Sequence, residues 1–112
     1  LLAPTADDSD AWHDSMRHIA REARAYVLTS VVFQRASSHP DGVPLAGGDD
    51  LMSRGGTAIL GPDGTYLAGP LWEEPGIVTA VLDPARLDEE RQRFDPAGHY
   101  HRPDVFRRSA GP

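Results

Sequence analysis

Cysteine is absent from this chain of 112 residues. Its absence excludes a disulfide framework, a thiolate zinc site and a cysteine nucleophile within these residues. Apolar runs approaching the roughly 18 residues of a membrane-spanning helix are also missing, and so is a basic amphipathic stretch. We therefore expect a cytoplasmic protein with no membrane partner.

An excess of positive charge is lacking too. The chain carries 17 acidic and 11 basic residues, for a formal net charge of −6. That balance repels a phosphate backbone, so we expect no nucleic-acid partner. The sequence also lacks a G-x-S-x-G elbow, which leaves any serine–histidine–aspartate triad drawn from its five histidines arbitrary.

The length suits one small domain or a piece of a larger one. The chain does not start with Met, and residues 1–4 form an apolar opening that is typical of the end of a strand. Residues 109–112 have the composition of a frayed tail. We therefore expect a piece of a larger domain.

A helix is predicted over residues 10–24. The apolar residues that share one helical face are Trp12, Met16, Ile19, Ala20, Ala23 and Val27. Ser9 or Asp10 can cap the first turn by accepting a hydrogen bond from a free backbone N–H. On the polar side, His18 can pair with Glu22 one turn later.

The rest of the chain predicts alternating strands and helices. The expected elements are a buried strand over 25–33, a long polar loop over 34–54, a hairpin of strands 55–60 and 65–68, a strand over 77–82 and a helix from Asp83 to about Phe94. The first strand is almost continuously apolar, which indicates a strand covered on both faces. A helix leading into such a strand favours a layered α/β fold.

Four collinear segments, 2–10, 15–30, 54–83 and 95–106, resemble the nitrilase branch of the carbon–nitrogen hydrolase superfamily. The most specific is the last, which contains Gly-His-Tyr followed by Arg-Pro-Asp-Val-Phe. The resemblance implies a four-layer αββα sandwich, of which this chain would be the C-terminal part. Residues 1–94 would then belong to the hydrolase domain and residues 95–112 to a C-terminal tail.

The family resemblance also implies a chemistry. Nitrilases use a Glu, a Lys and a Cys: thiolate attack on the nitrile carbon gives a thioimidate, and water then releases ammonia and a carboxylic acid. In the resemblance all three residues lie upstream of Leu1, so we expect no catalytic residue here, and no cofactor. Alternatives are a cyanide-converting or amidase relative of the same superfamily, and a non-catalytic assembly module.

Three residues are predicted to contact the small-molecule nitrile. Pro4 and Thr5 lie in a turn at the end of a strand, and strand ends in α/β folds face the site. Trp12 follows at the start of the helix and either lines the substrate pocket or is the first core anchor of that helix. Val31-Val32 stand where the family often has Asn-Gln, which bears on substrate preference.

Metal binding is not expected, although two clusters hold residue types that bind metals. They are His99, His101 and Asp104 in the tail, and Asp7, Asp8 and Asp10 before the helix. The tail residues are explained by packing within the family motif. The acidic residues lack the following Gly and the distal Glu of a calcium loop, so capping of the helix explains them.

A homo-oligomer is expected from the resemblance, with contacts through helix 10–24 and the tail. Family members pair subunits through outer helices, and here Arg17, Arg21 and Arg24 alternate with acidic residues along the helix. The alternative is a solvated charged face. The tail is too rich in aromatic residues for a free segment, because disordered tails are usually poor in such groups.

Overall fold

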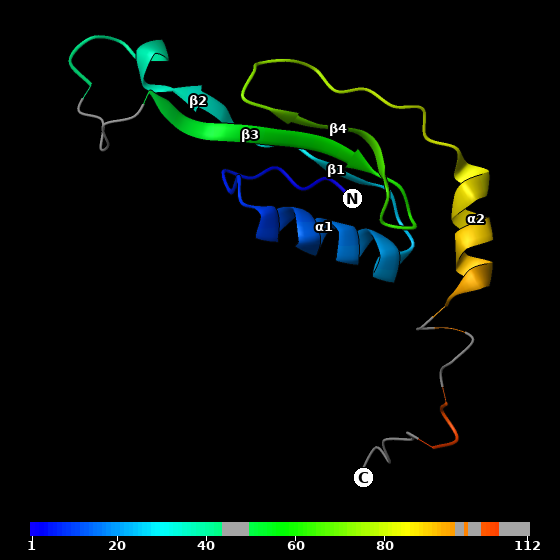
Figure 1. Ribbon diagram of the computed structural model, residues 1–112. Coiled ribbons are helices and arrows are strands. Elements are labelled where there is room, and N and C mark those ends of the chain that lie inside the picture. The colour runs from blue at the N-terminus through cyan, green and yellow to red at the C-terminus, as the bar shows by residue number, and fades with distance from the viewer. Residues whose placement is uncertain (44–49, 96–97, 99–101, 106–112) are drawn as a thin grey trace.

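The computed structural model describes residues 1–43, 50–95, 98 and 102–105. Its elements are α1 (Asp10–Ala23), β1 (Val27–Thr29), β2 (Phe33–Arg35), the 3-10 turn η1 (Ala36–Ser38), β3 (Leu51–Leu60), β4 (Tyr66–Trp72) and α2 (Pro84–Arg93). The strands form one sheet built around β3. Figure 1 shows α1 along one side of this sheet, whereas the chain after β4 passes along the other side to reach α2.

The predicted first helix is confirmed as α1. The Ser9 side chain caps it by accepting a hydrogen bond from the Trp12 backbone N–H at 3.2 Å, and Arg24, whose φ of 48° is left-handed, is its C-cap. The expected ion pair on its polar side is present, with His18 and Glu22 3.0 Å apart. The core lies between α1 and the sheet, and its members are Met16, Ala20, Val27 and Leu60, with Ala3 and Trp12 packed against them.

The single buried strand predicted over 25–33 is wrong in part. The segment forms two strands, β1 and β2, which both pair antiparallel with β3. The pairing of Phe33 with Arg54 continues the register of Val27 with Leu60, but the ladder is interrupted between them. Nor are both faces of the segment covered, because Val32 is 48% exposed.

The interruption has a local cause in β3. Gly55 and Gly56 have φ values of 81° and 116°, which only glycine adopts readily, and they distort the strand opposite Val31. The Thr57 hydroxyl replaces the missing backbone partner: it accepts from Val31 N at 3.0 Å and lies 3.3 Å from Val31 O. A side chain thus satisfies the backbone groups that a regular ladder would pair.

The N-terminal residues extend the sheet beyond β1. Leu2 and Thr5 form parallel bridges with Leu28 and Val31. Ala3 N donates to Leu28 O at 2.9 Å. The strand-like character predicted for the opening residues is therefore present.

The predicted hairpin is confirmed, and it is longer than expected. Its turn, over residues 61–64, is closed by the Gly61 N–H on Thr65 O at 2.8 Å and the Gly64 N–H on Gly61 O at 2.9 Å. The loop predicted over 34–54 is partly wrong, because β2 and the first residues of β3 lie within it. Within that range, residues 44–49 lie outside the described part of the chain.

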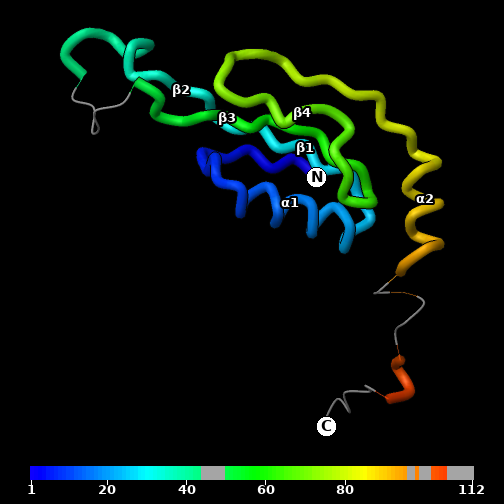
Figure 2. Tube along the Cα trace, viewed as in Figure 1, coloured from blue at the N-terminus to red at the C-terminus, as the bar shows by residue number. Residues whose placement is uncertain are grey.

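The strand predicted over 77–82 is wrong. The described residues between β4 and α2 form no strand, and the chain there runs as an unpaired segment toward α2 (Figure 2). Ile77 and Val81 are 91% and 93% exposed. Their β-branched side chains favour extended backbone, but a strand also needs a neighbouring backbone to pair with, and none lies beside them in the described residues.

The predicted second helix is confirmed as α2. Asp83 caps it by accepting a hydrogen bond from Ala85 N at 2.9 Å, and Pro84 occupies the first turn. Tyr26, buried after α1, donates its hydroxyl to Asp83 O at 2.7 Å. This contact fixes the start of α2 to the residue before β1.

Candidate functional site

A groove lies on the sheet face opposite α1. One part of it, about 470 Å³, is lined by the N-terminal segment, β1, β3 and residues 76–78. Leu28 and Ile59, paired in the ladder, contribute to its floor, and Pro4 to its wall. Its described lining includes hydroxyl groups but no charged side chain.

A second part of the same groove, about 250 Å³, continues along β3. The two parts share Ser30, Thr57 and Gly76, and the second part adds Glu74 to the lining. We call both parts together the sheet-face groove. An apolar floor with a few hydroxyl groups suits an uncharged organic group. Two of the lining hydroxyls are engaged elsewhere: Thr57 bonds Val31, and Thr29 bonds Trp12 and Ala3.

The predicted site residues lie in different places. Pro4 lines the sheet-face groove, whereas Thr5 and Trp12 are not among its lining residues. The Trp12 indole N–H donates to Thr29 Oγ1 at 2.9 Å, and Thr29 Oγ1 in turn donates to Ala3 O at 2.9 Å. Trp12 therefore packs against the core, as the core-anchor alternative predicted. Through Thr29 it also supports Ala3, the residue before Pro4.

Sequence reasoning missed Ser30 and Thr57. Ser30 directly follows β1, and Thr57 lies beside the apolar end of β3; a hydroxyl next to apolar residues was the available signal. Their meeting in one groove depends on the β1–β3 register, which brings residues 27 positions apart onto the same face.

The acidic residues before α1 are not all helix caps. Asp7 accepts from Ser9 N at 2.9 Å, and the hydrogen bonds from Ser9 lower the pKa of the Asp7 carboxyl. Asp8 and Asp10 instead bind Arg54 of β3, at 2.8 Å and 2.7 Å. The capping prediction is therefore incomplete, because the partner lies far along the sequence.

A buried histidine lies beside this cluster. His13 is 4% exposed, its Nδ1 lies 2.8 Å from the Tyr66 hydroxyl, and its ring centroid is 4.9 Å from that of Trp72. Nε2 has no hydrogen-bond partner in the described part of the chain. Burial lowers the pKa of His13, and the charge of Arg54 lowers it further; Asp10, the Gly56 backbone and Asp14 act in the opposite direction.

His13 should make the folded protein less stable in acid. Since its folded-state pKa lies below 6.5, the unfolded chain binds the proton more readily, and stability falls as pH drops from about 6.5 through the lowered folded-state pKa. We expect His13→Asn to flatten this fall, because Asn can still bond Tyr66 but does not titrate. Urea unfolding from pH 7.5 to pH 5 measures it. The same slope in both proteins would contradict the assignment.

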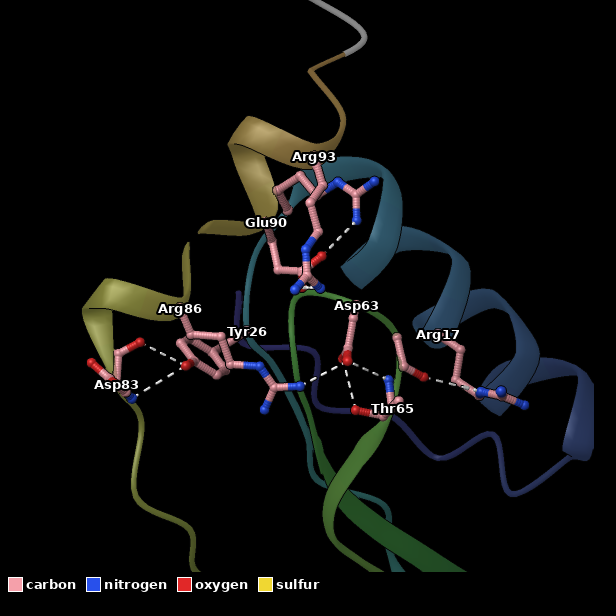
Figure 3. Close-up of polar contacts among 10 residues, drawn as sticks. Arg17, Tyr26, Asp63, Thr65, Asp83, Arg86, Glu90 and Arg93 are labelled. Carbon is pink, nitrogen blue, oxygen red and sulfur yellow. Dashed lines mark hydrogen bonds and ion pairs between the residues drawn. The ribbon is translucent and has the colours of Figure 1, made fainter. Parts of the chain in front are cut away.

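A network of polar side chains joins α2 to the hairpin turn (Figure 3). Arg86 donates to Asp63 at 2.7 Å, and Asp63 also accepts from the Thr65 hydroxyl at 2.7 Å. Glu90 accepts from Arg93 at 2.7 Å and from the buried Arg24 at 3.2 Å. Each carboxylate in this network is bound by at least one arginine, and the contacts hold α2 on the body of the fold.

The described residues contain no group of three or more side chains that could hold a metal ion. His99 and His101, considered as ligands above, lie outside the described residues. Within the same part of the chain, neither helix has the length and apolar character needed to cross a membrane.

Comparisons with known proteins agree on one family. The family described as Carbon-nitrogen hydrolase matches residues 5–92. Among similar curated proteins, Nitrilase blr3397 of Bradyrhizobium diazoefficiens is 43% identical over 93% of this chain and 33% of its own length. Nitrilase 1 of Arabidopsis thaliana is 41% identical over 93% and 32%. The aliphatic nitrilase of Sinorhizobium fredii is 40% identical over 94% and 35%.

A solved structure shares the fold. The carbon–nitrogen hydrolase from Helicobacter pylori G27 superposes with a TM-score of 0.66 at 20% identity, over 93% of this chain and 37% of that one. The α/β fold predicted from the sequence is thereby confirmed as the carbon–nitrogen hydrolase fold. The chain spans about a third of the length of the curated relatives it matches.

Proposed function

The chain belongs to the carbon–nitrogen hydrolase family, and from that premise we propose that it forms part of a nitrilase, which converts a nitrile and water to a carboxylic acid and ammonia. The observation that carries the proposal is identity of 40% or more to three nitrilases over more than nine-tenths of the chain. We propose that this chain is the C-terminal part, because its four segments resemble that part of the family in the same order. Residues 1–94 would then complete the hydrolase domain, and residues 95–112 would form the tail.

In this proposal the nucleophilic Cys, the Glu and the Lys come from elsewhere in the enzyme, since the chain holds no Cys. The present chain contributes to binding of the substrate. Pro4 provides one wall for the organic group of the nitrile, Thr5 holds that wall to the segment after β1, and Trp12 supports it through Thr29. A preformed apolar wall orients the substrate and keeps water away from it.

The sheet-face groove also bears on the four-layer architecture. Leu2, 81% exposed, and Ile77, 91% exposed, leave apolar surface on the sheet face away from α1. We propose that a second sheet of the enzyme packs there, since two sheets bury such faces against each other. α1 would then be an outer layer of the sandwich.

We also propose a cytoplasmic homo-oligomer with contacts through α1 and the tail. The outward face of α1 presents Ser15, His18 and Glu22, all exposed. Arg17 is less suited to that contact than its sequence position suggested, because its guanidinium donates to Gly64 O at 3.2 Å and lies over the Tyr66 ring. Of the tail, residues 96–97, 99–101 and 106–112 lie outside the described residues.

Nitrile hydrolysis tests the function directly. We expect the complete enzyme that contains this sequence to release ammonia and a carboxylic acid from benzonitrile or a short aliphatic nitrile. The 112-residue chain alone should release no more than a heat-killed control, because it contains no thiolate. Ammonia assays with both proteins decide: turnover by the isolated chain, or none by the complete enzyme on either nitrile, would overturn the proposal.

A further inference from the structure

Arg54 contacts the turn before α1 and the residues at the end of β4. Its Nε donates to Asp8 O at 2.8 Å, its Nη2 to Asp10 Oδ1 at 2.7 Å, and its backbone N–H to Asp8 Oδ2 at 2.8 Å. Its carbonyl accepts from Glu73 N at 2.7 Å. Its guanidinium lies 4.2 Å from the centroid of the Trp72 ring. One side chain thus joins the turn before α1, the distorted part of β3 and the end of β4.

The turn before α1 has two anchors. At its start, Thr5 N donates to Ser30 O at 2.9 Å, and Thr5 O accepts from Val32 N at 3.3 Å. At its end, Asp8 is bound by Arg54 through both its carboxylate and its carbonyl oxygen. Between them the turn makes only local bonds. Without the side chain of Arg54, Asp8 would keep only its bond to the backbone N–H of residue 54. The turn that follows Pro4, a lining residue of the sheet-face groove, would then be held less firmly.

The contacts of the Arg54 side chain contribute unequally to stability. Asp10 is 85% exposed at its side chain, so that ion pair contributes little on its own. The bond to the Asp8 carbonyl and the contact with Trp72 depend on a flat group with donors in fixed directions. Lysine provides a point charge on a flexible stem and cannot make these contacts together.

We propose that Arg54 is a positioning residue: it holds the turn of residues 5–9 so that the Pro4 wall keeps its place, and it thereby sets how tightly the organic group of the substrate is bound. This inference rests on the proposed nitrilase function. It assigns Arg54 no contact with the substrate.

The test is Arg54→Lys in the complete enzyme, with Arg86→Lys as the matched control. Arg86 has a similar side-chain exposure (33% against 36%) and an ion pair of the same length, 2.7 Å, but lies by the hairpin turn. We expect Arg54→Lys to raise KM for benzonitrile about tenfold with kcat within about twofold, because binding is lost and the chemical groups stay. Arg86→Lys should leave both constants unchanged. An unchanged KM in Arg54→Lys, or the same change in both variants, overturns the proposal.

Failure of the proposed function is distinguishable from failure of this inference. If the unaltered enzyme hydrolyses no nitrile, hydrogen exchange of its backbone amides decides the positioning role. We expect the amides of Asp7 and Ser9 to exchange about tenfold faster in Arg54→Lys, with the Leu28 amide of β1 unchanged. Equal exchange at Asp7 and Ser9 in both proteins would overturn the role.

Discussion

Gly56→Ala is expected to lower the free energy of unfolding by about 3 kcal/mol or more. A Cβ at this position would lie 2.5 Å from a Trp72 ring carbon and 2.7 Å from His13 Nε2, both far inside van der Waals contact. The His13 ring cannot withdraw easily, because it is buried on the inner face of α1 and bonded to Tyr66. In addition, φ of 116° strains any residue with a Cβ. Urea unfolding of the protein measures the change.

Gly42→Ala separates the two causes. Gly42 also has positive φ, 86°, but a Cβ there would meet nothing within 4 Å. This variant should lose only the backbone term, about 1 to 2 kcal/mol. Equal losses in the two variants would mean that the contact with Trp72 and His13 does not constrain position 56.

Glu90→Ala is expected to cost about 3 kcal/mol of the free energy of unfolding, because it leaves the Arg24 guanidinium buried without its carboxylate. The side chains of Arg24 and Glu90 are 9% and 6% exposed. Arg24 keeps its bond to Phe94 O, at 3.1 Å, and its place over the Phe94 ring, so the loss should not reach the top of the usual range. Thermal or urea unfolding provides the measurement.

Asp88→Ala on the same helix is the matched control. Asp88 and Arg91 are 3.9 Å apart and 80% and 60% exposed, so water replaces the lost pair. We expect a change of no more than about 0.5 kcal/mol. If Asp88→Ala costs as much as Glu90→Ala, the effect belongs to helix α2 itself and not to the buried pair.

Local chemistry made several elements predictable from the sequence. The apolar face of residues 10–24 and the capping hydroxyl of Ser9 specify α1, and Asp83 followed by Pro84 specifies the start of α2. The turn of residues 61–64 specifies the hairpin. In each case the determining groups lie within a few residues of one another, so the hydrogen bonds that form the element are local in the sequence.

The candidate site was harder to predict from the sequence. Pro4 lines the sheet-face groove, whereas Trp12 packs against the core, where its indole N–H donates to Thr29, 17 positions later in the sequence. Ser30 and Thr57 became neighbours only through the strand register. Nothing near Arg54 in the sequence indicates that it binds Asp8 and Asp10, more than forty positions earlier.

The sequence by itself determined the helices, the hairpin turn and, through its four motifs, the family. Tertiary structure alone decided where β1 ends, since Gly55, Gly56 and Thr57 break the ladder from the opposite strand. It also decided that residues 77–82 do not pair, despite their β-branched pattern, and that His13 on the helix is buried. The physical reason is common to these cases: a strand's hydrogen bonds and a side chain's burial are made by residues distant in sequence, which no local pattern specifies.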